Sequence, residues 1–141
     1  KLVDINYHIY GSTKYLEKYG IPKTTNDLNK HRFISFGKGA PSPVFNPDWA
    51  LKLGNKDNKK RKSIMKVNSV MGLLLAVESG VGLAALPDYL VSQSQNIIKV
   101  LSKSEGPITE AHFVYPQSLK NVARVQAFRN FLYSKLSETK F

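Results

Sequence analysis

The stretch from Val67 to Asp88 limits the fold more than any other part of this 141-residue sequence. Its apolar residues follow the helical spacing i, i+3, i+4 and i+7, which is typical of a helix packed on a sheet: Val70, Leu73, Leu74 and Val77. Ser69 or Asn68 precedes them as a natural N-cap, and Gly80 stands where a helix ends in a left-handed residue. The sequence therefore predicts a helix that begins at residue 70 and ends before Gly80.

A short apolar run follows this helix, from Leu83 to Leu86. Such a run is typical of a strand that is covered on both faces. Pro87 suits the first position of another helix, and the helix dipole favours an acidic residue such as Asp88 there. Helix, strand and helix in close succession indicate an α/β protein.

The rest of the chain continues this alternation. Residues 3–10 alternate between apolar and polar side chains, which predicts a half-buried strand. Ser12 can cap a short helix that Gly20 ends. Further strands are expected at 33–36, 49–53, 63–67, 97–101 and 112–115, and a final helix at about 121–136. We therefore expect an α/β fold with a mixed, mainly parallel sheet flanked by helices.

A basic run separates two of these expected strands, Trp49 to Leu53 and Ser63 to Val67. We expect them to form a hairpin whose turn carries exposed charges: Lys56, Lys59, Lys60, Arg61 and Lys62. The formal net charge of +11 suggests nucleic-acid binding. No aromatic residues alternate with this run to stack on bases, so a solvated loop is favoured. Electrostatic contact with phosphate or another acidic surface stays open as an alternative.

Several classes of protein are disfavoured by composition. No apolar run approaches the ~18–20 residues that span a bilayer, and no signal peptide is visible at the start. Cysteine is absent, which excludes disulfides and fits a cytoplasmic protein. His8, His31 and His112 lie far apart in the sequence, so we expect no metal site and no cofactor.

Enzymatic activity is not expected either. Ser63 and Lys66 match the Ser-x-x-Lys pair of penicillin-binding enzymes, but that pair must share a helix face and this segment alternates like a strand. The Gly80-Val-Gly82 fragment follows a helix, whereas a dinucleotide-binding glycine motif follows a strand. No nucleophile, base and orienting group come together in the sequence.

One segment suggests ligand binding. The turn Val67-Asn68-Ser69 places polar side chains and main-chain N–H groups at the start of a helix and the end of a strand. Such a position holds a carboxylate or another anion well, and open α/β sheets bind ligands at the ends of their strands. Taken by itself, the alternative that Ser69 only caps its own helix is favoured.

Several short segments along the chain match the motifs of one known protein family, and they occur in the same order as in that family. Tyr10-Gly-Ser-Thr-Lys-Tyr-Leu16 is similar to an Ala-Ser-Pro-x-Tyr-Leu motif, with Thr13 in place of the usual proline. The remaining matches are Gly20-Ile-Pro22, Asp27-Leu28, His31, Trp49, Asn68, the run 76–89 (Ala-Val-Glu-Ser-Gly-Val-Gly-Leu-Ala-Ala-Leu-Pro-Asp-Tyr), Val100-Leu101, Val114-Tyr-Pro116 and Val125-x-x-Phe-x-x-Phe-Leu132. Over nearly the whole chain, this order resembles the effector-binding domain of LysR-type transcriptional regulators.

The resemblance implies the two-lobed architecture of type 2 periplasmic binding proteins, with a small effector held between the lobes. Residues 1–108 then correspond to the second lobe, and residues 109–141 to a strand and helix that return to a mostly absent first lobe. The effector contacts that match the family on this lobe are Asn68, Ser69 and Val70.

The resemblance also implies the partners. They are a small-molecule effector and other copies of the chain in a dimer or tetramer. The helix start at Ser69 favours a carboxylate or another anion as that effector. DNA would be bound only through an N-terminal domain that these residues lack. We expect another copy to cover the 125–132 face of the final helix, or that helix to be loosely held. The alternative within the same fold is the solute-binding protein of a transporter.

Overall fold

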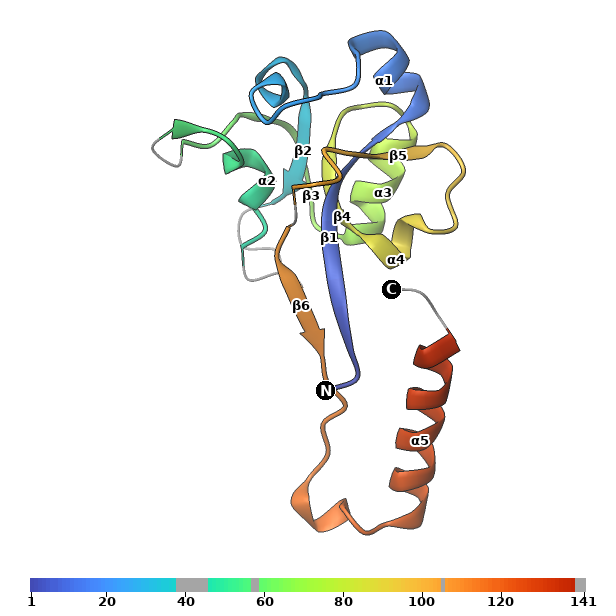
Figure 1. The fold of residues 1–141 in the computed structure, drawn as a ribbon. Coiled ribbons are helices and arrows are strands. Elements are labelled where there is room, and N and C mark those ends of the chain that lie inside the picture. Colours follow the sequence, from blue (N-terminus) through green and yellow to red (C-terminus); the bar gives the residue numbers. More distant parts are fainter. Residues whose placement is uncertain (38–45, 57–58, 105, 139–141) are drawn as a thin grey trace.

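The computed structural model describes residues 1–37, 46–56, 59–104 and 106–138. Its central strand is β1 (Val3–Ser12), which has antiparallel neighbours along its whole length (Figure 1). The first half of β1 pairs with β6 (Ile108–Ala111), and the second half lies between β4 (Ala84–Pro87) and β5 (Ile97–Val100). β1 therefore links the main body of the domain to the chain that returns at its C-terminal end.

Among the described residues, parallel pairing is found in a separate two-stranded sheet and in one bridge that connects it to β4. β2 (Phe33–Phe36) runs parallel to β3 (Ser63–Val67). Phe33 also forms a parallel bridge with Leu83, next to a hydrogen bond of 2.9 Å from the Ile34 N–H to the Leu83 carbonyl. The mixed α/β sheet is thus confirmed, but the parallel majority expected from the sequence is wrong. β1 runs against all three of its partners, and apolar periodicity carries no information on strand direction.

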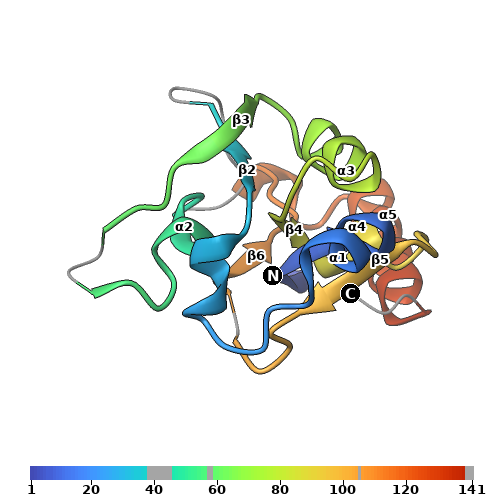
Figure 2. The same ribbon diagram turned by 90° about the horizontal axis from the view of Figure 1, so that it is seen from above.

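Helices cover both faces of the sheet (Figure 2). α3 (Val70–Glu78) and α4 (Asp88–Val91) enclose one core with the sheet, which includes Ile34, Leu73, Val77, Leu86 and Ile97. On the other face, α1 (Thr13–Tyr19), the 3-10 helix η1 (Asp27–Lys30) and α2 (Trp49–Lys52) enclose a second core, which includes Ile9, Tyr15, Leu28, Phe33 and Leu51. The structure therefore has three layers, with the strands in the middle and helices on either side.

The helix boundaries predicted from capping residues are confirmed. The Ser12 hydroxyl accepts a hydrogen bond of 3.3 Å from the Tyr15 N–H at the start of α1. The Ser69 hydroxyl accepts one of 2.9 Å from the Gly72 N–H at the start of α3. Gly80 has a φ of 75° after the end of α3, a left-handed conformation that favours glycine.

The expected hairpin between residues 49 and 67 is wrong. Residues 49–52 form the helical turn α2, in which the Leu51 N–H donates to the Asp48 carbonyl at 3.0 Å. Ala50 and Leu51, which are neighbours in sequence, are both buried, and an alternating strand would not bury both of them toward one core. β3 consequently pairs with β2, and the basic run is a connection from α2 to β3.

The last part of the chain lies apart from the sheet and its helices (Figure 1). The expected strand at 112–115 is wrong, because the pairing with β1 uses residues 108–111 instead. A 3-10 helix, η3 (Gln117–Leu119), leads to α5 (Ala123–Glu138), and no residue of α5 is buried. In the described part of the chain, no helix is long and apolar enough to cross a membrane.

Candidate functional site at the start of helix α3

The predicted site residues lie where β2 and β3 end side by side. Phe36 is paired with Val67, and the Gly37 N–H donates to the Val67 carbonyl at 3.0 Å. A Cβ atom at Gly37 would lie 2.5 Å from Oδ1 of Asn68, so the amide of Asn68 lies directly against this glycine. The structure therefore brings a second strand end to the predicted site, which sequence spacing did not indicate.

Ser69 has the capping role that the sequence favoured, because its side chain accepts a hydrogen bond from the Gly72 N–H at the start of α3. Its side chain and that of Asn68 are exposed, while Val70 is half-buried against the core formed with α3. The first N–H groups of a helix have no partner within the helix, and Ser69 takes up only one of them. The N–H groups of Val70 and Met71 form no hydrogen bond within the described part of the chain, so they can bind an anion.

A cavity of about 470 Å³ begins at the same strand end and extends along the face of the sheet toward α2. Ser35, Gly37, Leu51, Ser63 and Lys66 are among the residues that line it. Asn68, Ser69 and Val70 are not among its described lining residues, so the predicted triad lies beside the cavity. Sequence analysis missed it because it depends on the pairing of β3 with β2 and on α2 being a helix.

Ser63 and Lys66 do not form a catalytic dyad. Both lie on β3, and the Ser63 hydroxyl lies 2.6 Å from the main-chain carbonyl of Met65 and 3.2 Å from that of Phe33. The hydroxyl is thus held by the main chain, with no hydrogen bond to Lys66 in the described structure. The strand predicted for residues 63–67 is confirmed.

Arg61 differs from the rest of the basic run. Its guanidinium donates hydrogen bonds to the carbonyls of Leu53 at 2.8 Å and Thr25 at 3.1 Å, and to the side-chain oxygen of Asn29 at 2.8 Å. Burial lowers its pKa from the ordinary value. The prediction of a solvated side chain is wrong for Arg61, which fastens the α2 connection to η1, and holds for Lys56, Lys59, Lys60 and Lys62, which are exposed.

A half-buried group of titratable side chains surrounds Asp88 between α4, β1 and β5. Its carboxylate accepts hydrogen bonds of 2.8 Å each from the Tyr10 hydroxyl and Lys99 Nζ, and lies 2.8 Å from His8 Nδ1. Burial alone raises the pKa of Asp88, but the bonds from Lys99, His8 and Tyr10 outweigh it and hold the pKa below its ordinary value. Burial and the bond to Asp88 raise the pKa of Tyr10 far above normal. Each of these side chains is hydrogen-bonded or ion-paired to Asp88, so the group connects α4 to β1 and β5.

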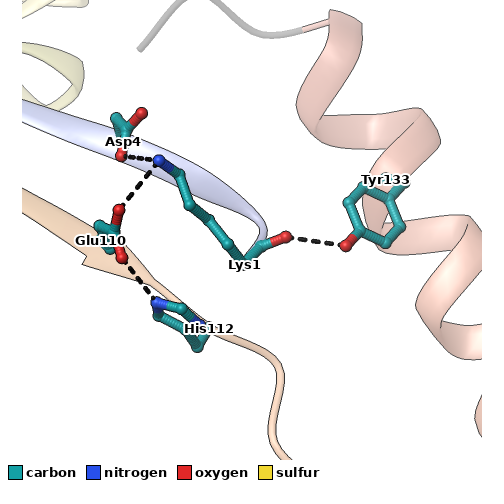
Figure 3. Close-up of polar contacts among 5 residues, drawn as sticks. All are labelled: Lys1, Asp4, Glu110, His112 and Tyr133. Carbon is teal, nitrogen blue, oxygen red and sulfur yellow. Dashed lines mark hydrogen bonds and ion pairs between the residues drawn. The ribbon is translucent and has the colours of Figure 1, made fainter.

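A second polar group ties the chain ends together (Figure 3). Lys1 Nζ contacts Asp4 at 2.6 Å and Glu110 at 3.0 Å, and Glu110 in turn lies 3.0 Å from His112 Nε2. The Tyr133 hydroxyl donates to the Lys1 carbonyl at 2.7 Å. These side chains are about half exposed, which suits a link between β1, β6 and α5. Within the described ranges, no cluster of His, Asp or Glu could hold a metal ion.

Comparison with known proteins accounts for this arrangement. Residues 1–137 match the family model described as the LysR substrate binding domain. Over 120 residues, the chain is 30% identical to an uncharacterized HTH-type transcriptional regulator of Haemophilus influenzae, covering 82% of this chain and 40% of the relative. It is 26% identical over 141 residues to an HTH-type transcriptional regulator of Xanthomonas campestris pv. campestris, covering 97% and 41%. The chain thus spans about two fifths of the curated relatives it matches.

Solved structures agree with the family match. The regulatory domain of CrgA, a LysR-type transcriptional regulator from Neisseria meningitidis, superposes with a TM-score of 0.73 at 25% identity, covering 96% of this chain and 66% of that one. The effector domain of the regulator AmpR of Pseudomonas aeruginosa shares the fold, with a TM-score of 0.60 at 16% identity over 96% and 63% of the two chains. The matched relatives are regulators, which does not favour the transporter alternative. This chain belongs to the LysR substrate-binding domain family, with the periplasmic-binding-protein-like fold expected from its sequence.

Proposed function

We propose that this chain is the ligand-sensing part of a LysR-type transcriptional regulator. The observation that carries the proposal is the meeting of two strand ends and a helix start at Gly37, Asn68 and Ser69. Open α/β sheets bind ligands at such a position, because the ends of the strands leave a crevice and the helix start supplies N–H donors. The family match supplies the regulatory context.

The effector proposed for this site is a small carboxylate or another anion. Asn68 supplies an amide, and the N–H groups of Val70 and Met71 point out of the first turn of α3. An effector that contacts α3 in only one arrangement of the lobes would shift the population toward that arrangement. This shift would reach DNA through a separate DNA-binding domain, of the HTH type that the relatives' names state. The chain itself acts as a binding module in the cytoplasm, without catalysis.

We further propose that residues 1–108 form the second lobe and residues 109–141 return to the first. Support comes from α5, which lies away from the sheet and buries none of its residues. Phe128 and Phe131 are about half exposed, at 51% and 54%. Apolar surface of this kind is normally covered, so α5 fits a role as part of a first lobe or of a contact between copies in a dimer or tetramer.

The test of the proposed site is Asn68→Ala in a complete regulator that carries this domain, measured with a transcription reporter against graded concentrations of candidate carboxylates. The expected result is an effector requirement raised about tenfold, the value of one good hydrogen bond to a charged group, with operator binding unchanged. The exposed Asn121→Ala on the segment before α5 is the matched control. A reporter response that Asn68→Ala leaves unchanged would contradict the proposed site.

A further inference from the structure

The cavity between β2, β3 and α2 is lined by more positively than negatively charged side chains. Among its described lining residues, the cationic side chains are Lys60, Arg61, Lys62 and Lys66, whereas Asp48 is the single carboxylate. That carboxylate is already ion-paired with Lys60 Nζ. The Arg61 guanidinium is bonded to neutral oxygens of Leu53, Thr25 and Asn29, which satisfy its donors without cancelling its charge.

The remaining cations, Lys62 and Lys66, form no ion pair with any described residue. Lys62 directly precedes β3 and Lys66 lies near its end, and both line the cavity. Both side chains are exposed and border the same half-open cavity, and an anion that lies between two like charges offsets their repulsion. The surroundings thus favour a ligand that carries more than one negative charge.

The cavity also offers a hydroxyl from the sheet. Ser35 is only 6% exposed and lies opposite Lys66 in the register between β2 and β3. Among the described residues, its hydroxyl has one long contact, 3.4 Å to the carbonyl of Phe36. Rotation of the hydroxyl would replace this contact with a shorter bond to a ligand oxygen, since a hydroxyl hydrogen turns freely to suit its acceptor.

We propose that this cavity binds a small molecule with two or more negative charges, a polycarboxylate or a phosphorylated compound, held by Lys62, Lys66 and the Ser35 hydroxyl. All three groups belong to the second-lobe part of the chain, so this binding does not require another lobe. It is also independent of the proposed function, in which the effector is bound beside the cavity at Asn68 and the start of α3. An oligonucleotide could bind the two exposed lysines without a contact to the buried Ser35, so Ser35→Ala separates the two kinds of ligand.

The experiment titrates the 141-residue chain with citrate, inorganic phosphate, benzoate and a short DNA duplex by calorimetry. Trp49, the single tryptophan of the sequence, follows Asp48 at the start of α2 and supplies a fluorescence readout. The same titrations are made with the double variant K62A/K66A, with Ser35→Ala, and with K103A/K120A. The last variant removes the same two charges from exposed positions away from the cavity. Thermal midpoints of all variants show whether each remains folded.

We expect saturable binding of citrate or phosphate, with the two probes separating polycarboxylate from phosphate ligands, and much weaker binding of benzoate. K62A/K66A should weaken binding about tenfold or more, and Ser35→Ala about fivefold, because bonds to charged ligand oxygens are strong. K103A/K120A should stay within about twofold of the original chain, since exposed charges at a distance are screened. The proposal is overturned if neither multivalent anion binds, if both double variants weaken binding equally, or if the duplex binds in preference and Ser35→Ala has no effect.

Discussion

The Tyr133 hydroxyl donates a hydrogen bond of 2.7 Å to the main-chain carbonyl of Lys1, which joins α5 to the start of β1 (Figure 3). With no buried residue of its own, α5 has few other contacts of this kind. Tyr133→Phe should therefore speed hydrogen exchange in the amides of α5 about two- to fivefold, the effect of losing one exposed hydrogen bond. Exchange in β1, β4 and β5 should not change.

Tyr115→Phe is the matched control, because Tyr115 precedes η3 and its hydroxyl forms no hydrogen bond within the described structure. Equal exchange rates in both variants and in the original chain would contradict the role of Tyr133. Neither variant removes the aromatic contacts of α5, such as that of Phe113 with Phe128 at 5.6 Å between ring centroids.

Arg61 should contribute more to stability than any other residue of the basic run. Arg61→Lys keeps the charge but loses the planar set of donors that reaches Leu53, Thr25 and Asn29. We expect the free energy of unfolding, measured in urea, to fall by about 2 kcal/mol, since half-buried acceptors lose their partners. Lys59→Met in the same connection should change it by less than about 0.5 kcal/mol. If both substitutions changed the free energy of unfolding equally, Arg61 would have no special structural role compared with the exposed lysines of this connection.

The Asp88 group predicts a loss of stability in acid. Because the pKa of Asp88 is lower in the folded chain than in the unfolded chain, its contribution is complete above the unfolded pKa of about 3.9 and is lost as the pH falls through the folded value. Asp88→Asn should therefore lower the free energy of unfolding by about 1–2 kcal/mol at neutral pH, and the difference should shrink below about pH 4. Urea titrations from pH 7 to pH 3 measure this.

Glu17→Gln is the control for that series, because it removes an exposed carboxylate of α1. Its effect should be small across the whole range. A gap between Asp88→Asn and the original chain that stays constant down to pH 3 would show that the carboxylate charge has no stabilising role.

Gly106 lies so close to β1 and α2 that there is no room for a side chain at this position. A Cβ atom there would lie 2.3 Å from the Tyr7 carbonyl and 2.6 Å from Cζ2 of Trp49. Gly106→Ala should therefore force the segment at residue 106 away from β1 and α2 and destabilise the chain by about 1–3 kcal/mol. The fluorescence of Trp49 should shift toward that of a more exposed indole. An unchanged spectrum and unfolding midpoint would contradict this packing.

The local features of the fold were predictable from the sequence because single residues determine them. Ser12 and Ser69 cap their helices as expected, Gly80 ends α3, and the apolar run before Asp88 is the strand β4. Each of these depends on the chemistry of one side chain or on a short run of apolar residues.

The features that were missed depend on contacts between distant segments. Trp49 to Leu53 has apolar residues at every second position, but five residues cannot separate a strand from one helical turn. The antiparallel direction of β1 and the cavity lined by Lys66 arise from the pairing of strands far apart in the chain. The role of Arg61 depends on its contacts with Thr25 and Asn29, which are more than 30 residues away in the sequence. The site proposed at Asn68 could be predicted because the strand end and the helix start are adjacent in sequence, whereas Gly37, which lies against Asn68, follows another strand.

The central claim is that an anionic effector is bound at the start of α3. Backbone amide shifts in the two-lobed effector domain, followed by NMR during titration with a small-carboxylate effector, test it most directly. The account predicts saturating shifts at Gly37, Asn68, Ser69 and Val70, and their loss in Asn68→Ala. Saturable binding with unchanged amides at these four positions would contradict it.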